Sequence, residues 1–248
     1  MIFALTAQDV GVVLDVAAGF DPDDPLSREP LAATAPSFGS GFRFGVPPAK
    51  DLDFFGDADA EALFGAAVAM FEAVGGTPVE INFAPFRDGG RMLYEGPWVA
   101  ERLNATERLL SESPEALLPI TRTIIERGRD YSALDAFRAQ YRLSVLHRAA
   151  EDVLATVDCL LLPTAGTIYE IAAVMADPVR LNTNLGLYTA FANLLDLSAV
   201  AFPAGLRTNG LPFGISLLAP AFAERALLEL ATRFQQRAGL SYGAPPVV

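Results

Sequence analysis

The sequence has few of the residues on which several common kinds of site depend. Among its 248 residues there is one cysteine, Cys159, one histidine, His147, and one lysine, Lys50. A single cysteine excludes an internal disulfide and is typical of a reducing compartment. One His, one Cys and dispersed carboxylates do not supply the ligands of a metal site. We therefore expect no bound metal, and the absence of a glycine-rich phosphate loop predicts no nucleotide cofactor.

Excess positive charge and long apolar runs are also lacking. The formal net charge is −12, which argues against general binding to nucleic acid or to anionic lipid, because both are polyanions. Hydrophobic residues make up 52% of the chain, yet no apolar run reaches the roughly 18 residues of a membrane span. Residues 2–5 are too short for a signal sequence and lack a basic flank. We expect a cytoplasmic protein that binds neither nucleic acid nor membrane.

Apolar periodicity and capping residues predict alternating helices and strands. Helices are expected from Thr6 to before Gly19 and over residues 57–74, 94–111, 114–127, 132–157 and 222–238, and strands over residues 42–46, 77–83, 158–163 and 198–203. Asn209-Gly210 is a hairpin turn signal within residues 206–218, whereas Gly75-Gly76 and Gly89-Gly90 are interpreted as turns and residues 21–37 as loop. The pattern indicates α/β layers around a mixed sheet, with residues 158–163 and 198–203 as neighbouring buried strands.

Several segments resemble those of amidase-signature enzymes. Residues 2–9 and 19–24 are similar to the stretch just downstream of that family's nucleophilic serine, and residues 193–205 and 209–214 are similar to its C-terminal pattern. Two longer runs, residues 93–102 and 177–186, resemble the amidase domain of allophanate hydrolases. The resemblance implies an amidase-signature-like mixed sheet flanked by helices, incomplete, with residues 1–248 as the C-terminal part of a single amidase domain.

The resemblance also implies that the catalytic residues lie elsewhere. Enzymes of this family use a serine nucleophile, a second serine in a cis peptide and a lysine, all of which precede the region matched here. Residues 39–41 (Gly-Ser-Gly) and Lys50 lie downstream of the opening motif and are misplaced for these roles. His147 is expected on a helix surface, Cys159 in the core and Ser216 in a structural position. We predict no catalytic residue in this sequence.

Tyr94 and Arg102 are the candidate substrate-binding residues. The matching Tyr and Arg of allophanate hydrolases are expected to hold the carboxylate end of the substrate, and the spacing of eight is retained here. An arginine suits this role because its planar guanidinium donates two parallel hydrogen bonds to a carboxylate. The alternative interpretation is that Tyr94 packs in the core and Arg102 pairs with Glu95 or Glu101.

The function implied is that of an allophanate hydrolase-like amidohydrolase, which hydrolyses an amide bond of allophanate in urea degradation. This sequence would be a partial domain, inactive alone, whose partners are a small carboxylated amide and a complementing N-terminal amidase half. Neither a metal nor an organic cofactor is implied, and self-association into a homo-oligomer is left open. The alternative is a stand-alone, non-catalytic carboxylate-binding or complex-forming protein.

Overall fold

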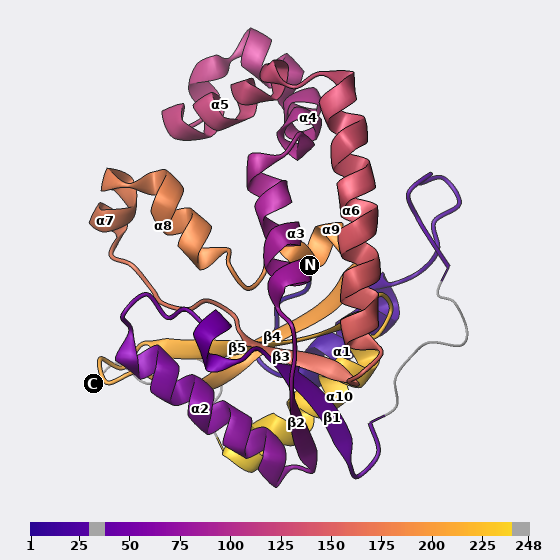
Figure 1. The fold of residues 1–248 in the computed structure, drawn as a ribbon, viewed down its shortest axis with the longest axis vertical. Helices are drawn as coiled ribbons and strands as arrows, with labels where there is room; N and C mark the ends of the chain where they lie inside the picture. Colours follow the sequence, from indigo (N-terminus) through magenta and orange to yellow (C-terminus); the bar gives the residue numbers. More distant parts are fainter. Residues whose placement is uncertain (30–37, 240–248) are drawn as a thin grey trace. The chain divides into compact units, whose positions relative to one another are not determined.

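The computed structural model describes residues 1–29 and 38–239, and the chain divides into two compact units (Figure 1). The sheet unit comprises Met1–Ile81, Leu154–Thr164 and Asp196–Val248, and the helical unit comprises Asn82–Val153 and Ala165–Leu195. Part of the loop expected over residues 21–37 lies outside the described residues. Within residues 1–29 and 38–239, no helix has both the length and the hydropathy needed to cross a membrane.

The sheet unit is a mixed five-stranded sheet with helices, as the sequence predicted. Its elements are α1 (Ala7–Ala17), β1 (Phe42–Val46), η1 (Ala49–Asp51), α2 (Ala58–Ala73), β2 (Gly76–Glu80), β3 (Cys159–Pro163), β4 (Leu197–Leu206), β5 (Pro212–Pro220) and α10 (Glu224–Ala238). The strand order is β2-β1-β3-β5-β4. The β1 strand pairs parallel with β2 and β3, whereas β5 pairs antiparallel with β3 and β4.

The expectation that residues 158–163 and 198–203 form neighbouring buried strands was wrong in two respects, because the strands are not neighbours and residues 198–203 are only partly buried. Both segments belong to the same sheet, as β3 and β4, but β5 lies between them. A hairpin at Asn209-Gly210, where Gly210 has φ +80° and the Leu211 amide donates to Asn209 Oδ1 at 3.1 Å, pairs β4 with β5. Of these two strands, β5 is mostly buried and pairs with β3, whereas the burial of β4 alternates and β4 lies at the edge of the sheet.

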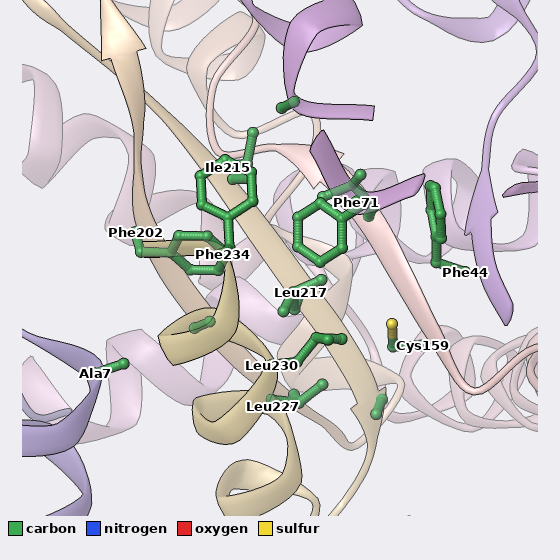
Figure 2. Packing of buried hydrophobic residues seen from close by; sticks show 14 of the residues in the cluster. Ala7, Phe44, Phe71, Cys159, Phe202, Ile215, Leu217, Leu227, Leu230 and Phe234 are labelled. Atoms are coloured by element: carbon green, nitrogen blue, oxygen red, sulfur yellow. The ribbon is translucent and has the colours of Figure 1, made fainter. Parts of the chain in front are cut away.

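The core of the sheet unit lies between the sheet and helices α2 and α10 (Figure 2). Phe71 of α2 stacks on Phe234 of α10 with ring centroids 5.1 Å apart, and Phe234 also contacts Phe202 of β4 at 5.3 Å. Helix α1 begins at the cap that the sequence predicted, because the Thr6 side chain accepts from the Asp9 amide. Helix α2 begins after Asp57, whose side chain accepts from the Ala60 amide, where the sequence indicated only an acidic helix start. Local capping and apolar periodicity thus account for most of this unit.

The helical unit contains no strand among its described residues. Its elements are α3 (Ala84–Glu95), α4 (Trp98–Glu112), η2 (Pro114–Ala116), α5 (Pro119–Glu126), η3 (Arg127–Asp130), α6 (Ala133–Leu154, whose last residue belongs to the sheet unit), α7 (Ile171–Ala176), α8 (Pro178–Leu185) and α9 (Phe191–Leu194). The long helix expected over residues 132–157 is confirmed as α6. Helices α3, α7, α8 and α9 were not predicted.

Two expectations about this unit were wrong. The helix predicted over residues 94–111 is interrupted at Gly96-Pro97, and Tyr94 belongs to the preceding helix α3. Gly89-Gly90, interpreted as a turn, lies inside α3. A β-carbon on Gly89 would lie 3.3 Å from the Leu195 side chain, and one on Gly90 would lie 3.4 Å from Ala190 Cβ. These glycines therefore allow close packing of α3 against the segment that contains α9, which offsets their low helix propensity.

A buried aromatic cluster fixes α3 against residues 188–191. Phe83, Phe86, Tyr188 and Phe191 are all fully buried. Phe83 and Phe86 have ring centroids 5.8 Å apart, and Phe86 contacts Phe191 edge-on at 5.4 Å. Aromatic pairs at these separations add about 0.5–1.5 kcal/mol each beyond the area they bury. The cluster therefore positions both α3, which ends with Tyr94 and Glu95, and the chain that follows α8.

Candidate functional site

Tyr94 and Arg102 lie on consecutive helices and approach each other across the helix break. Tyr94 is in the last turn of α3, and Arg102 is in the second turn of α4. The Arg102 Cζ atom lies 6.0 Å from the centroid of the Tyr94 ring, at the outer limit of a cation–π contact. On one continuous helix these residues would be separated by about 12 Å along the axis. The break at Gly96-Pro97 is what brings them together.

The position of the break is set by contacts from η3 and the residue that follows it. The Tyr131 hydroxyl donates to the Glu95 carbonyl oxygen at 2.9 Å, which satisfies an acceptor at the end of α3. A β-carbon on Gly128 would lie 2.9 Å from Ala100 Cα and 3.0 Å from the Val99 carbonyl oxygen. The first turn of α4 therefore packs directly on the η3 backbone. Arg102 follows this turn at a half-buried position.

The polar groups of both side chains lack protein partners in the described part of the chain. The Tyr94 side chain is 46% exposed, so it is not a core residue. Neither its hydroxyl nor the Arg102 guanidinium makes a hydrogen bond or ion pair with residues 1–29 or 38–239, and Glu95 and Glu101 do not pair with Arg102. A phenolic donor and a five-donor cation are thus both available to a ligand. Their role in substrate binding stays a prediction.

Residues 93–102 and 177–186, the two runs that resemble allophanate hydrolases, contact each other at Tyr94. Asp177 caps α8 by accepting from the Arg180 amide at 3.3 Å, and the Arg180 Nε donates to Asp177 Oδ2 at 2.6 Å. Gly186 follows α8 and packs against Tyr94, because an added β-carbon would lie 2.9 Å from Tyr94 Oη and 3.3 Å from Tyr94 Cε2. Two segments that are far apart in sequence therefore meet at Tyr94 within the helical unit.

A further polar contact near this site was missed by sequence reasoning. The Asn184 side-chain amide donates to the Tyr169 hydroxyl at 2.8 Å, which links α8 to the segment before α7. Asn184 lies within the run of residues 177–186 that resembles allophanate hydrolases. Nothing in the sequence around Tyr169 indicates that its hydroxyl would bind Asn184. The sequence-based predictions included Gly186 only as the last residue of that run. Its contact with Tyr94 could not be found without tertiary structure.

The other residues considered from sequence lie outside this site. The His147 Nδ1 atom is 3.4 Å from Glu151 Oε1 on α6, and Lys50 is exposed on η1. Cys159 is fully buried in β3, where burial raises the pKa of its thiol. Ser216 is buried in β5 and its hydroxyl lies 2.9 Å from Thr164 Oγ1. Over the described ranges, no group of three or more His, Cys, Asp or Glu side chains is arranged to hold a metal ion.

The mixed sheet and the capped helices match a known protein class. A family profile described as Amidase matches residues 2–228, and the chain belongs to this family. The fold is similar to that of allophanate hydrolase from Kluyveromyces lactis, with a TM-score of 0.91 and 34% sequence identity over 98% of this chain.

Relatives of this chain include larger enzymes. The chain is 37% identical to urea amidolyase from Saccharomyces cerevisiae over 238 residues, which is 95% of this chain. It is 29% identical to an amidase from Pseudomonas putida over 247 residues, which is 96% of this chain. The chain spans 13% of the urea amidolyase, 51% of the P. putida amidase and 40% of the K. lactis allophanate hydrolase.

Proposed function

We propose that this chain is the substrate-recognition part of an allophanate hydrolase-like amidohydrolase. In this proposal the complete enzyme hydrolyses an amide bond of allophanate, and Tyr94 and Arg102 hold the carboxylate end of that substrate. Their role is to position the substrate for attack rather than to break a bond. The similarity to allophanate hydrolase and urea amidolyase supports this reaction class.

The observation that carries the proposal is that Arg102 has no ion-pair partner among the described residues and lies beside the Tyr94 ring. The chain has 30 acidic and 18 basic residues, so carboxylate partners are abundant, yet none in the described residues pairs with Arg102. A half-buried guanidinium without an anion is suited to an anionic ligand, because the planar fork of its N–H groups matches both oxygens of a carboxylate. The adjacent phenol supplies one more donor.

The same proposal assigns bond cleavage to residues outside this sequence. The serine, second serine and lysine that the family resemblance implies have no counterpart in a matching position here, so a complementing N-terminal amidase half is required. Two exposed apolar faces are consistent with such a partner. In the sheet unit, α1 exposes Val12, Val13 and Val16, and in the helical unit α6 exposes Leu134, Phe137, Tyr141 and Val145. Exposed apolar surface of this kind commonly marks contact sites.

Ligand binding tests the proposal directly. Malonamate is a stable isostere of allophanate, and malonamide has the same shape without the carboxylate. We expect this chain to bind malonamate in preference to malonamide when both are titrated by calorimetry. Arg102→Ala should weaken malonamate binding by about 2–5 kcal/mol, as expected for loss of a desolvated charge pair.

The control variant is Arg108→Ala on the same helix. Arg108 pairs with Glu112 at 3.8 Å, and its side chain is 89% exposed. Its loss should change binding by less than about 0.5 kcal/mol. Equal affinity for the two ligands, or equal effects of the two arginine substitutions, would contradict the proposed function.

A further inference from the structure

The Tyr94 side chain rests on a backbone surface that only a glycine provides. A β-carbon on Gly186 would lie 2.9 Å from Tyr94 Oη and 3.3 Å from Tyr94 Cε2. Real β-carbons essentially never approach another atom as closely as 2.9 Å. The present position of the Tyr94 hydroxyl is therefore incompatible with any side chain at residue 186. The contact joins α3 to the C-terminal end of α8 inside the helical unit.

The backbone of Gly186 does not itself require glycine. Its φ of −84° lies outside the positive-φ region that favours glycine, so this conformation is open to other L-residues. The missing side chain is therefore explained by the Tyr94 contact rather than by chain conformation. An alanine at this position would be tolerated by the local backbone and would act on Tyr94 alone.

Hydrogen bonds hold the Gly186 peptide in place on both sides. Its amide donates to the carbonyl oxygens of Asn182 at 3.0 Å and Thr183 at 3.2 Å. Its own carbonyl oxygen accepts from the amides of Thr189 at 3.1 Å and Ala190 at 2.9 Å. Tyr188, between these residues, is fully buried in the aromatic cluster. Hydrogen bonds thus hold the backbone under Tyr94 in place, whereas no hydrogen bond to the described residues holds the Tyr94 hydroxyl.

We propose that Gly186 is a positioning residue that determines where the Tyr94 hydroxyl lies relative to the Arg102 guanidinium. This inference rests on the proposed function, because the hydroxyl position matters only if Tyr94 and Arg102 share a carboxylate ligand. A methyl group at residue 186 moves the phenol outward and leaves Arg102 in place. The two donors then no longer converge on one carboxylate, although the helices that carry them keep their packing.

The test compares Gly186→Ala with Tyr94→Phe and with the double variant. Malonamate binding is titrated by calorimetry, and the melting temperature of each variant is recorded. We expect Gly186→Ala to weaken binding about tenfold with little change in melting temperature. Tyr94→Phe removes the oxygen that the new methyl group would meet. In that background, Gly186→Ala should change binding by less than about twofold, because the hydroxyl it displaces is already absent.

The matched control is Gly65→Ala on α2, where an added β-carbon has no neighbour within 4 Å. Its binding should equal that of the unsubstituted chain. Normal malonamate binding by Gly186→Ala, with Tyr94→Phe and Arg102→Ala impaired, would overturn the inference while leaving the proposed function intact. Unfolding of Gly186→Ala would also overturn it, since the glycine would then serve the fold. Failure of the unsubstituted chain to prefer malonamate over malonamide would overturn both.

Discussion

Arg207 forms a buried ion pair with Asp57, the residue that caps the first turn of α2. The side chain of Arg207 is 4% exposed and that of Asp57 is 16% exposed. The Asp57 carboxylate thus both accepts from the Ala60 amide and neutralises an arginine that follows β4. Arg207 Cζ also lies 5.6 Å from the Phe213 ring centroid. One carboxylate therefore joins the start of a helix to the β4–β5 hairpin.

Removal of either partner of this pair should be strongly destabilising. Arg207→Met leaves Asp57 as a poorly solvated charge, and Asp57→Ala leaves Arg207 unpaired and α2 uncapped. We expect each to lower the free energy of unfolding by about 3–5 kcal/mol, as for other broken buried pairs. Urea denaturation followed by circular dichroism measures the change. The double variant should cost less than the sum of the two single variants, and strict additivity would show that the residues do not interact.

Two glycine-to-alanine substitutions should have opposite effects on stability. Gly65→Ala, at an exposed position inside α2 with open space around it, should stabilise the chain by about 0.5–1 kcal/mol, because alanine is the better helix former. Gly128→Ala would place a β-carbon 2.9 Å from Ala100 Cα and should cost about 1–3 kcal/mol through overpacking. Chemical denaturation of both variants provides the measurement. A stabilising effect of Gly128→Ala would mean that η3 and α4 are not in close contact.

The contact between Thr208 and Asp59 should make stability depend on pH in the acid range. Thr208 donates to Asp59 Oδ2 from its hydroxyl at 2.6 Å and from its amide at 2.8 Å, and these hydrogen bonds lower the pKa of the Asp59 carboxyl. A lowered pKa in the folded state stabilises the fold above the unfolded value of about 3.9. This stabilisation is present at pH 7 and is lost as the pH falls through the lower, folded pKa.

Thr208→Val removes the hydroxyl donor and should therefore destabilise the chain more at pH 7 than at pH 3. Urea denaturation at both pH values measures this difference. Ser111→Ala is the control, because that hydroxyl donates to the Arg108 carbonyl oxygen at 2.9 Å and involves no titrating group. Its effect should be the same at both pH values. A Thr208→Val effect that is independent of pH would refute the assignment.

Hydrolysis of allophanate should require a second polypeptide segment. We expect this chain alone to show no detectable ammonia release from allophanate, because the proposed function assigns the nucleophile and the proton carrier to residues outside this sequence. Addition of an amino-terminal amidase half, fused or co-expressed, should restore hydrolysis. Arg102→Ala in the restored enzyme should lower kcat/KM. Hydrolysis by the chain alone would contradict the assignment of catalysis to other residues, and binding without restorable hydrolysis would favour a stand-alone binding protein.

Local sequence signals predicted the elements whose structure depends on neighbouring residues. Thr6 and Asp57 cap helices because their side chains reach amides three residues ahead, and Asn209-Gly210 forms a hairpin because Gly210 adopts a positive φ. The caps and the turn depend on interactions within a few residues, and the sequence alone determines them. The apolar composition of Cys159–Pro163 also indicated a buried strand, but the pairing of that strand with β1 and β5 depends on segments distant in the sequence.

Tertiary structure decided the features that depend on distant partners. The Gly89-Gly90 pair is helical because a buried aromatic cluster and the close approach of Leu195 and Ala190 stabilise α3. The sequence named Tyr94 and Arg102 through a family resemblance, but their approach depends on a helix break held by Tyr131 and Gly128. The contact of Tyr94 with Gly186 joins segments on opposite sides of α6 in the chain. No local pattern encodes such a contact, because it exists only once both segments have packed.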